Sequence, residues 1–230
     1  MKGLLVRVGI DSTDGRWNAP LNSNTGEFAY VTIIETKSVR PGFERLYDEF
    51  APAVSKFELE IPRHLKGVKT HLDPDFSTLT YGDQGERAKQ IGRLDPDDLL
   101  VFFASLRDFR NARLAYALIG LYVIEEIVSA ESIPQNRWRE NAHTRRIPGR
   151  TDIVLRARKK VSGRLQQCIP IGEYRERAYR VKQELLDAWG GLTVKGGYLQ
   201  RSARLPAFRD ATKFYEWFLT RSSSLLQKNN

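Results

Sequence analysis

Three groups of residues have the types and spacing for chemistry, and the first is a histidine motif. The chain reads HLDPD at residues 71–75. Side chains two residues apart in an extended segment point to one side, so His71, Asp73 and Asp75 are expected to converge. An imidazole between carboxylates is compatible with a divalent metal ion, although no particular cofactor is indicated, or with a histidine general base. An Asp-Pro-Asp turn explains the same residues without a site. Two more polar side chains follow: Tyr81 and Asp83.

The second group lies in the loop after the first expected strand. Asp11, Ser12, Thr13, Trp17 and Asn18 bring a carboxylate, two hydroxyls, an indole and an amide into eight residues. Together these groups could hydrogen-bond a polar ligand and stack on a flat one. A turn leading into a hairpin, with Trp17 as a core residue, explains them equally well.

The third group is a cationic segment. The formal net charge is +9, and residues 137–164 alone hold 10 basic and 2 acidic side chains. Cations interleaved with Trp138 suit phosphate contacts and base stacking, so a nucleic acid is the expected partner and a membrane is not. Ion pairs with the acidic residues of 1–136 are the alternative. The candidate phosphate ligands are Arg137, Arg139, Arg145, Arg146, Arg156, Arg158, Lys159, Lys160 and Arg201.

Several classes of protein are excluded by what the sequence lacks. Cys168 is the single cysteine, so neither an intramolecular disulfide nor a cysteine zinc cluster can form. The chain has no P-loop, no HExxH and no GxSxG motif. It also has no run of 18 apolar residues. We therefore expect a cytoplasmic protein.

The elements that must position these residues change type along the chain. Turn signals and β-rich apolar runs predict strands at residues 4–10, 28–34, 99–106, 114–128 and 151–158. Helices are expected at 42–56, 173–191 and 207–220, where apolar residues recur at helical spacing, and 57–94 is expected to be irregular. This order predicts one α+β domain over residues 1–230, mainly β and acidic up to 136, basic and helical toward the end.

Motifs along nearly the whole chain resemble one family. They are VRVGIDSTDGRWNAPLNSNTGEFAYV, RPGFERLYDEF, HLDPDFSTLTYGD, DPDDLLVFFASL, ALIGLYVIEEI, WGGL and YLQRSAR. They are similar to the third of the nucleotide modification associated domains, proteins connected with DNA base hypermodification in phages and prokaryotes. The resemblance implies a role on modified bases in DNA beside partner modification enzymes. The matching motifs carry these site positions: Asp11, Ser12, Trp17, Asn18, His71, Asp73, Asp75, Tyr81 and Asp83.

A weaker likeness concerns the two long apolar runs. Residues 97–103 and 117–121 look like the strand pair of PUA-like domains, the group with ASCH, EVE and YTH modules. Those domains hold a base in the aromatic pocket of a small mixed barrel. This likeness implies a partly barrel-like sheet followed by C-terminal helices.

Two main functional hypotheses follow, and a cavity would separate them. In the first, favoured here, the protein is an enzyme on a DNA base, with acid/base or metal chemistry from Asp11, His71, Asp73, Asp75 and Asp83. In the second, it is a reader that holds a modified base between aromatic walls, with Trp17, Tyr81 or Trp138 as candidates. Converging titratable groups favour the enzyme, and an aromatic cage favours the reader. A nucleic-acid-binding protein without a pocket is the third alternative.

Overall fold

The computed structural model describes residues 1–13, 15–199, 204–221 and 224–230. Its strands are β1 (Gly3–Val8), β2 (Pro20–Leu21), β3 (Ile33–Ile34), β4 (Thr70–His71), β5 (Thr80–Asp83), β6 (Leu99–Asp108), β7 (Leu114–Ser129), β8 (Ile153–Ala157), β9 (Gly163–Pro170), β10 (Gly172–Arg175), β11 (Ala178–Val181) and β12 (Leu225–Leu226). Its α-helices are α1 (Ala51–Ser55), α2 (Gly85–Ile91), α3 (Ala142–Arg145), α4 (Gln183–Ala188) and α5 (Ala211–Leu219). Short 3₁₀ turns, η1 to η6, lie between them.

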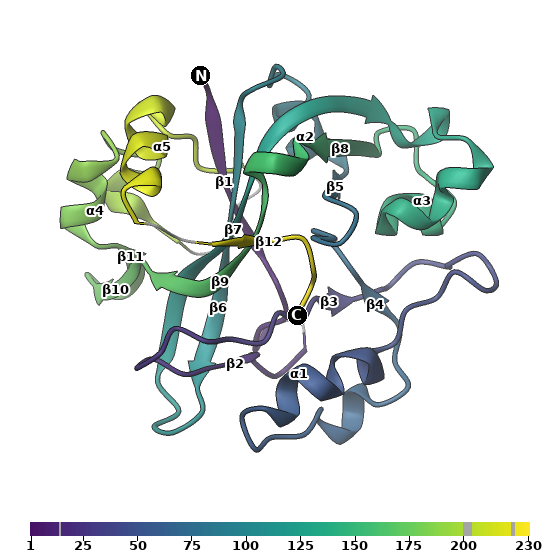
Figure 1. The fold of residues 1–230 in the computed structure, drawn as a ribbon, viewed down its shortest axis with the longest axis horizontal. Helices are drawn as coiled ribbons and strands as arrows, with labels where there is room; N and C mark the ends of the chain where they lie inside the picture. Colours follow the sequence, from purple (N-terminus) through teal and green to yellow (C-terminus); the bar gives the residue numbers. More distant parts are fainter. Residues whose placement is uncertain (14, 200–203, 222–223) are drawn as a thin grey trace.

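A mixed eight-stranded sheet is the frame of the molecule (Figure 1). Its main order is β1-β6-β7-β8-β5, with β2 beside β6, and with β9 beside β7 and β12. β1 is parallel to β6, whereas β7 is antiparallel to β6, β8 and β9. The 16-residue β7 pairs with β9 near its middle and with β8 at its end. The described strands do not close into a barrel, and the expected α+β class is confirmed.

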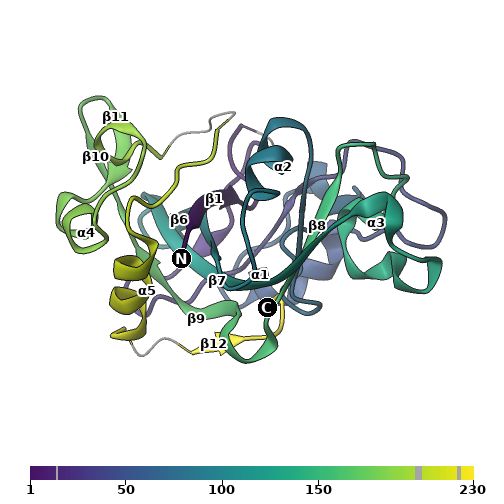
Figure 2. The same cartoon turned by 90° about the horizontal axis from the view of Figure 1, so that it is seen from above.

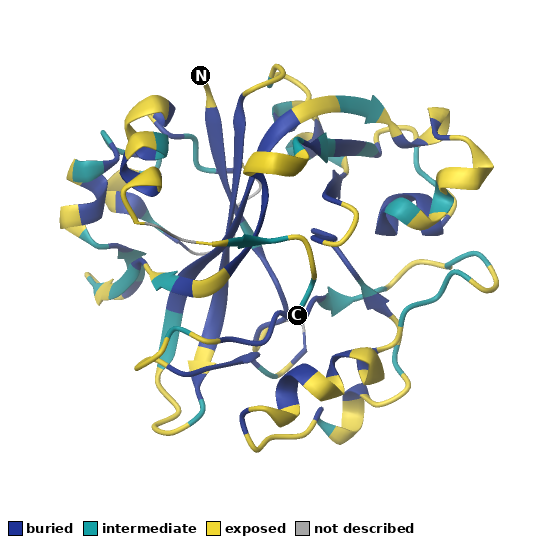
Figure 3. Ribbon diagram, viewed as in Figure 1, coloured by how far each residue is buried: buried dark blue, intermediate teal, exposed yellow. Residues whose placement is uncertain are grey.

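The middle parts of β6 and β7 are largely apolar because both faces of the sheet are covered there, whereas Glu125 and Glu126 near the end of β7 are exposed. Along β6, Leu100 and Phe102 point to one hydrophobic core, while Val101 and Phe103 point to the other. Figure 3 shows β1, β6 and most of β7 as buried. α4 and α5 lie together on one side of the sheet, with the β10–β11 hairpin, and bury an aromatic group around Trp189 there (Figure 2).

Several expected elements differ from those found. Only Ile33–Ile34 of the expected strand 28–34 pairs as a strand, and the segment 57–94 contains β4, β5 and α2. The expected helix 173–191 is the β10–β11 hairpin followed by α4. Glu176 and Arg177, both at positive φ, form the two-residue turn that joins these strands. The apolar residues at helical spacing therefore come from two antiparallel strands and a short helix.

A buried ion pair fixes the segment that leads into α3. The Arg145 guanidinium donates to the Asp75 carboxylate at 2.6 Å, and both side chains are almost wholly buried. The same Arg145 Nη2 donates to the Arg139 carbonyl at 2.8 Å, and Asn229 donates to the other Asp75 oxygen at 2.9 Å. This network joins three distant parts of the chain, because Asp75 precedes β5, Arg145 ends α3, and Asn229 lies near the C-terminus.

We expect Asp75→Ala to destabilise the protein, because it leaves the Arg145 charge buried without its carboxylate. Loss of one partner of a buried pair costs roughly 3–5 kcal/mol of unfolding free energy. Glu60→Ala is the matched control, since Glu60 pairs with Lys66 in a highly exposed ion pair worth about 0–1 kcal/mol. Urea unfolding of both variants measures the difference. An equal, small effect in both would contradict this role of Asp75.

Candidate functional site

A cavity of about 340 Å³ opens beside the sheet. It is bordered by the end of β1, the segment from Ile33 to Lys37, β5, the start of α2, and residues 198–199 and 204–206. Gln90 of α2 holds the last of these segments through two hydrogen bonds, at 2.8 and 2.9 Å, with the backbone of Leu205. The apolar residues that line the cavity include Leu5, Phe103 and Leu199. An apolar wall with a few converging polar groups is the usual form of a ligand site.

Two histidines and a carboxylate meet at the cavity wall. The Nε2 atom of His71 lies 3.8 Å from Asp73 Oδ2, and the Nε2 atom of His143 lies 3.7 Å from the same oxygen. The two imidazole rings are 5.0 Å apart and nearly perpendicular. Asp73 accepts hydrogen bonds from the Gly82 N–H and from the Asn141 amide. The three side chains come from β4, the residues after it, and α3.

Each histidine is held at its other ring nitrogen by a second carboxylate. His71 Nδ1 lies 2.6 Å from Glu35 Oε2, and His143 Nδ1 lies 2.9 Å from Asp152 Oδ2. The pairing of β3 with β4 brings Glu35 beside His71, and Asp152 directly precedes β8. With a proton on Nδ1, each imidazole donates to its carboxylate and leaves Nε2 on the side of Asp73. At His143 the guanidinium of Arg146 shares this arrangement, since its Nη2 lies 3.0 Å from Nδ1 and donates to Asp152 Oδ2 at 2.9 Å.

Gly82 is required where β5 passes this cluster. A Cβ atom at this position would lie 2.4 Å from His143 Cδ2 and 2.7 Å from Asn141 Oδ1. Only glycine therefore allows the β5 backbone to approach His143 this closely and to donate its N–H to Asp73.

Burial and hydrogen bonding shift the pKa values of His143, Asp73 and Glu35 in different directions. Burial lowers the pKa of His143 to about 4, against the hydrogen bond to Asp152, which raises it. Burial raises the pKa of Asp73 well above its usual range, and the neighbouring charges of Asp83 and Asp75 act in the same direction. Burial alone would raise the pKa of Glu35, but the contacts with His71 prevail and lower it to about 2. Perturbed pKa values in a cavity are typical of functional sites.

A second polar group lies on the wall formed by β5 and α2. Tyr81 donates to Asp83 Oδ2 at 2.7 Å, and Arg87 contacts the Tyr81 hydroxyl at 2.9 Å and the Asp83 carboxylate at 3.0 Å. Burial raises the pKa of the Tyr81 hydroxyl, which keeps it a protonated donor. Cations also line the cavity, namely Arg7, Lys37, Arg87, Arg146 and Arg204.

The residues of the first loop lie outside the cavity lining and make structural contacts. Asp11 is buried and pairs with Arg7 at 2.7 Å, so it orients a side chain that does line the cavity. Asn18 donates to the Ser105 carbonyl and hydroxyl, and Trp17 packs against the hydrophobic core. Ser12 and Thr13 are exposed in the turn that follows Asp11.

Of the histidine motif, the structure brings His71 and Asp73 together but not Asp75. β4 ends at His71, so the strand alternation that would align Asp75 does not continue. Asp75 instead exchanges backbone hydrogen bonds with Thr80 and pairs with Arg145. The expected convergence of His71, Asp73 and Asp75 is therefore wrong in its third member.

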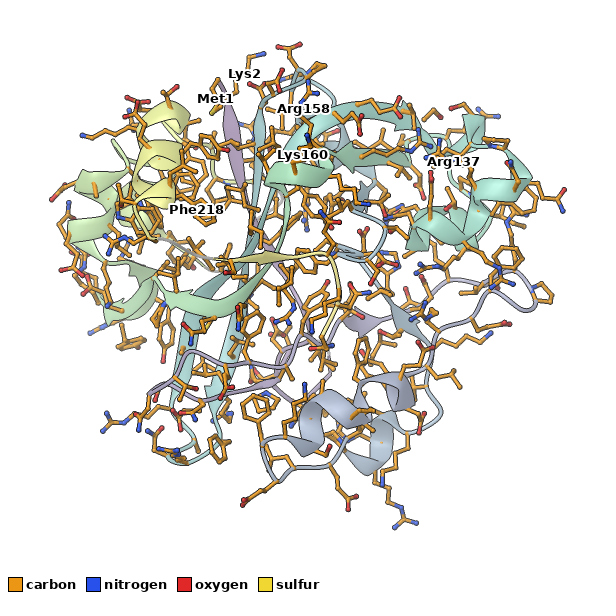
Figure 4. The ribbon with its side chains drawn as sticks, in the orientation of Figure 1. Met1, Lys2, Arg137, Arg158, Lys160 and Phe218 are labelled. Atoms are coloured by element: carbon orange, nitrogen blue, oxygen red, sulfur yellow. The ribbon has the colours of Figure 1, made fainter. Side chains whose placement is uncertain are left out.

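Most of the candidate phosphate ligands are engaged with acidic residues and are spread over different surfaces. Arg137 pairs with Glu140, Arg156 with Glu126 and Glu140, and Arg158 with Asp97. Arg137 lies far from Arg158 and Lys160 in Figure 4. Arg145 is buried, while Arg146 lines the cavity and pairs with Asp152 at 2.9 Å.

The other candidate ligands of nucleic acid also lie outside the cavity or outside the described residues. Arg139 stacks over Phe43, and Trp138 contacts Phe43 and lies beneath Arg40. Lys159 and Lys160 are exposed in η5, outside the cavity lining. Arg201 lies outside the described residues.

The sequence analysis does not identify Glu35, Arg87 and His143, which line the cavity, or Asp152, which holds His143 from behind. His143 precedes the Arg145-Arg146 pair in a segment dominated by positive charge, which favoured phosphate binding as the interpretation. No local motif joins these residues, since tertiary contacts bring them together: the β3–β4 and β5–β8 pairings, and the contacts of Asn141 with Asp73 and Thr80 that hold the start of α3.

Comparison with known proteins gives one finding. Residues 2–208 match the family described as nucleotide modification associated domain 3. Neither the comparison with curated proteins nor the comparison with solved structures finds a match. Among the described residues, no helix is long and apolar enough to span a bilayer. Because the match covers most of the chain, the protein belongs to the nucleotide modification associated domain 3 family.

Proposed function

We propose that the protein is an enzyme that acts on a single base or modified nucleotide of DNA in the cavity described above. The observation that carries this proposal is the convergence of His71, Asp73 and His143, with Glu35 and Asp152 behind the histidines, at one wall of that cavity. The family supports a nucleotide-modifying system as the context. Buried, oppositely shifted titratable groups are the arrangement that acid/base chemistry needs.

The size and charge of the cavity fit one nucleotide better than a duplex. Its volume of about 340 Å³ is near the lower end of the roughly 300–1,000 Å³ range of small-ligand pockets. A base in DNA must therefore leave its stack to enter, at a cost of about a few kcal/mol. Lys37 is exposed at the cavity edge and Arg87 is partly buried in its wall, and we expect these two cations to contact the phosphates of such a nucleotide.

The lining favours catalysis over simple reading of a base. Tyr81 is the single member of the expected aromatic cage that borders the cavity, since Trp17 and Trp138 pack elsewhere. Its hydroxyl is engaged with Asp83 and Arg87, a polar arrangement suited to hydrogen bonding with a base edge. The reader hypothesis then becomes the alternative outcome of the tests below.

The first test looks for a chemical product. DNA carrying plain and modified bases is incubated with the protein, candidate co-substrates and divalent metal ions, and its nucleosides are identified by mass spectrometry. We expect a changed nucleoside with the native protein and a yield at least ~100-fold lower with His71→Ala, because general acid/base groups contribute about 10²–10⁴-fold.

The control for this test is His64→Ala. His64 contacts the Gly15 carbonyl, away from the cluster, so this variant should keep full activity. Selective binding of modified DNA without any changed nucleoside would contradict the enzyme proposal and favour a reader.

The second test concerns the phosphates. We expect Lys37→Ala to weaken the binding of single-stranded DNA equally for all sequences. The slope of log K against log salt concentration should become shallower by about 1, because one fewer phosphate contact releases counterions. Lys66→Ala is the matched control, since Lys66 is similarly exposed but pairs with Glu60 outside the cavity. Fluorescence anisotropy at several salt concentrations measures both variants. Equal affinity and slope for Lys37→Ala and the native protein would contradict binding across the cavity mouth.

A further inference from the structure

We propose that His71 Nε2, Asp73 Oδ2 and His143 Nε2 bind one divalent first-row transition metal ion. One donor atom from each of the three residues lies within 4.8 Å of those of the other two. The role of the ion in a reaction rests on the function proposed above, whereas its binding does not.

The distances within the cluster fit a shared ion better than direct hydrogen bonds. At 3.7 and 3.8 Å, the Nε2 atoms are too far from Asp73 Oδ2 for hydrogen bonding, yet both lie near the same oxygen. Donors bound at about 2.0–2.2 Å in tetrahedral geometry are roughly 3.3–3.6 Å apart. Both nitrogen–oxygen distances are therefore within about half an ångström of those expected around one ion.

The atoms around the three donors match the surroundings of known metal sites. Glu35 and Asp152 each hold the Nδ1 of one histidine, which fixes the ring and leaves Nε2 as the ligand atom. The Gly82 N–H and the Asn141 amide orient the Asp73 carboxylate from behind. Metal-bound histidines usually donate the N–H of their other ring nitrogen to such a carboxylate.

The charge balance at the cluster also favours a cation. Asp73, Glu35 and Asp152 bring three almost completely buried carboxylates to the cluster, whereas one guanidinium, that of Arg146, pairs with Glu35 and Asp152 there. A buried carboxylate without a cation is costly, and a bound metal ion would stabilise its charged form.

The donor set selects the class of ion. Two imidazole nitrogens and one carboxylate oxygen suit zinc or iron(II), whereas magnesium and calcium prefer oxygen ligands. Three protein ligands would leave coordination positions open, and because the cluster borders the cavity, a nucleotide held there would lie next to the ion.

Equilibrium dialysis of the full-length, metal-free protein against Zn²⁺, followed by elemental analysis, tests the proposal. We expect one zinc ion per chain in the native protein, retained in excess Mg²⁺, and at least 100-fold weaker binding in His71→Gln and His143→Gln. Glu35→Gln should weaken binding by about 10–100-fold, because it removes support for a ligand and not a ligand itself.

The third histidine provides the matched control. His64→Gln removes an imidazole that contacts Gly15 and should bind zinc like the native protein. Circular dichroism checks that each variant is folded, and the native protein tests the proposal even if a variant is not. No bound zinc in the native protein, or equal binding in His64→Gln and in folded His71→Gln, would overturn the proposal.

The outcomes separate this inference from the proposed function. Zinc bound as expected, with no change in any nucleoside, overturns the function and keeps the metal site. A changed nucleoside produced by protein that binds no metal overturns the metal site and keeps the function.

Discussion

The candidate site depends on the burial of one carboxylate, that of Asp73. It receives the Gly82 N–H from β5 and the Asn141 amide from the start of α3, and it faces the Nε2 atoms of His71 and His143. A buried carboxyl group needs such hydrogen-bond partners, so the segments that supply them must be held in place. The Asp75–Arg145 pair does this from behind the site, and the double-faced core of the sheet provides the rigid base.

The long strands of the fold could be predicted because their signal is local. β6 and β7 are apolar runs long enough to be buried on both faces, and their turn is marked by polar residues. β4 and β5 have only two and four residues, and their partner strands lie far along the chain. They are therefore too short to show a periodic pattern in the sequence. The spacing that predicts a helix over 173–191 combines apolar residues of the β10–β11 hairpin with those of α4.

Part of the candidate site could also be predicted from local sequence. His71 and Asp73 are predicted to converge because they are two residues apart in a segment expected to be extended. β4 ends at His71, and the hydrogen bonds from Gly82 and Asn141 hold Asp73 beside it. The same alternation was extended to Asp75, beyond the end of the strand, where a turn and Arg145 determine its direction. Glu35, His143 and Asp152 join the cluster only through tertiary pairing. The charge of 137–164 suggested a phosphate-binding surface, whereas the structure uses much of it in ion pairs.

A crystal structure of the protein with a bound 5′-mononucleotide tests the central claim most directly, since it shows where the base goes. Our account predicts electron density for the base inside the cavity, beside His71 and His143, with the phosphate toward Lys37 and Arg87. Density for the nucleotide over η5 or another surface of the basic segment, with the cavity unfilled, would contradict it.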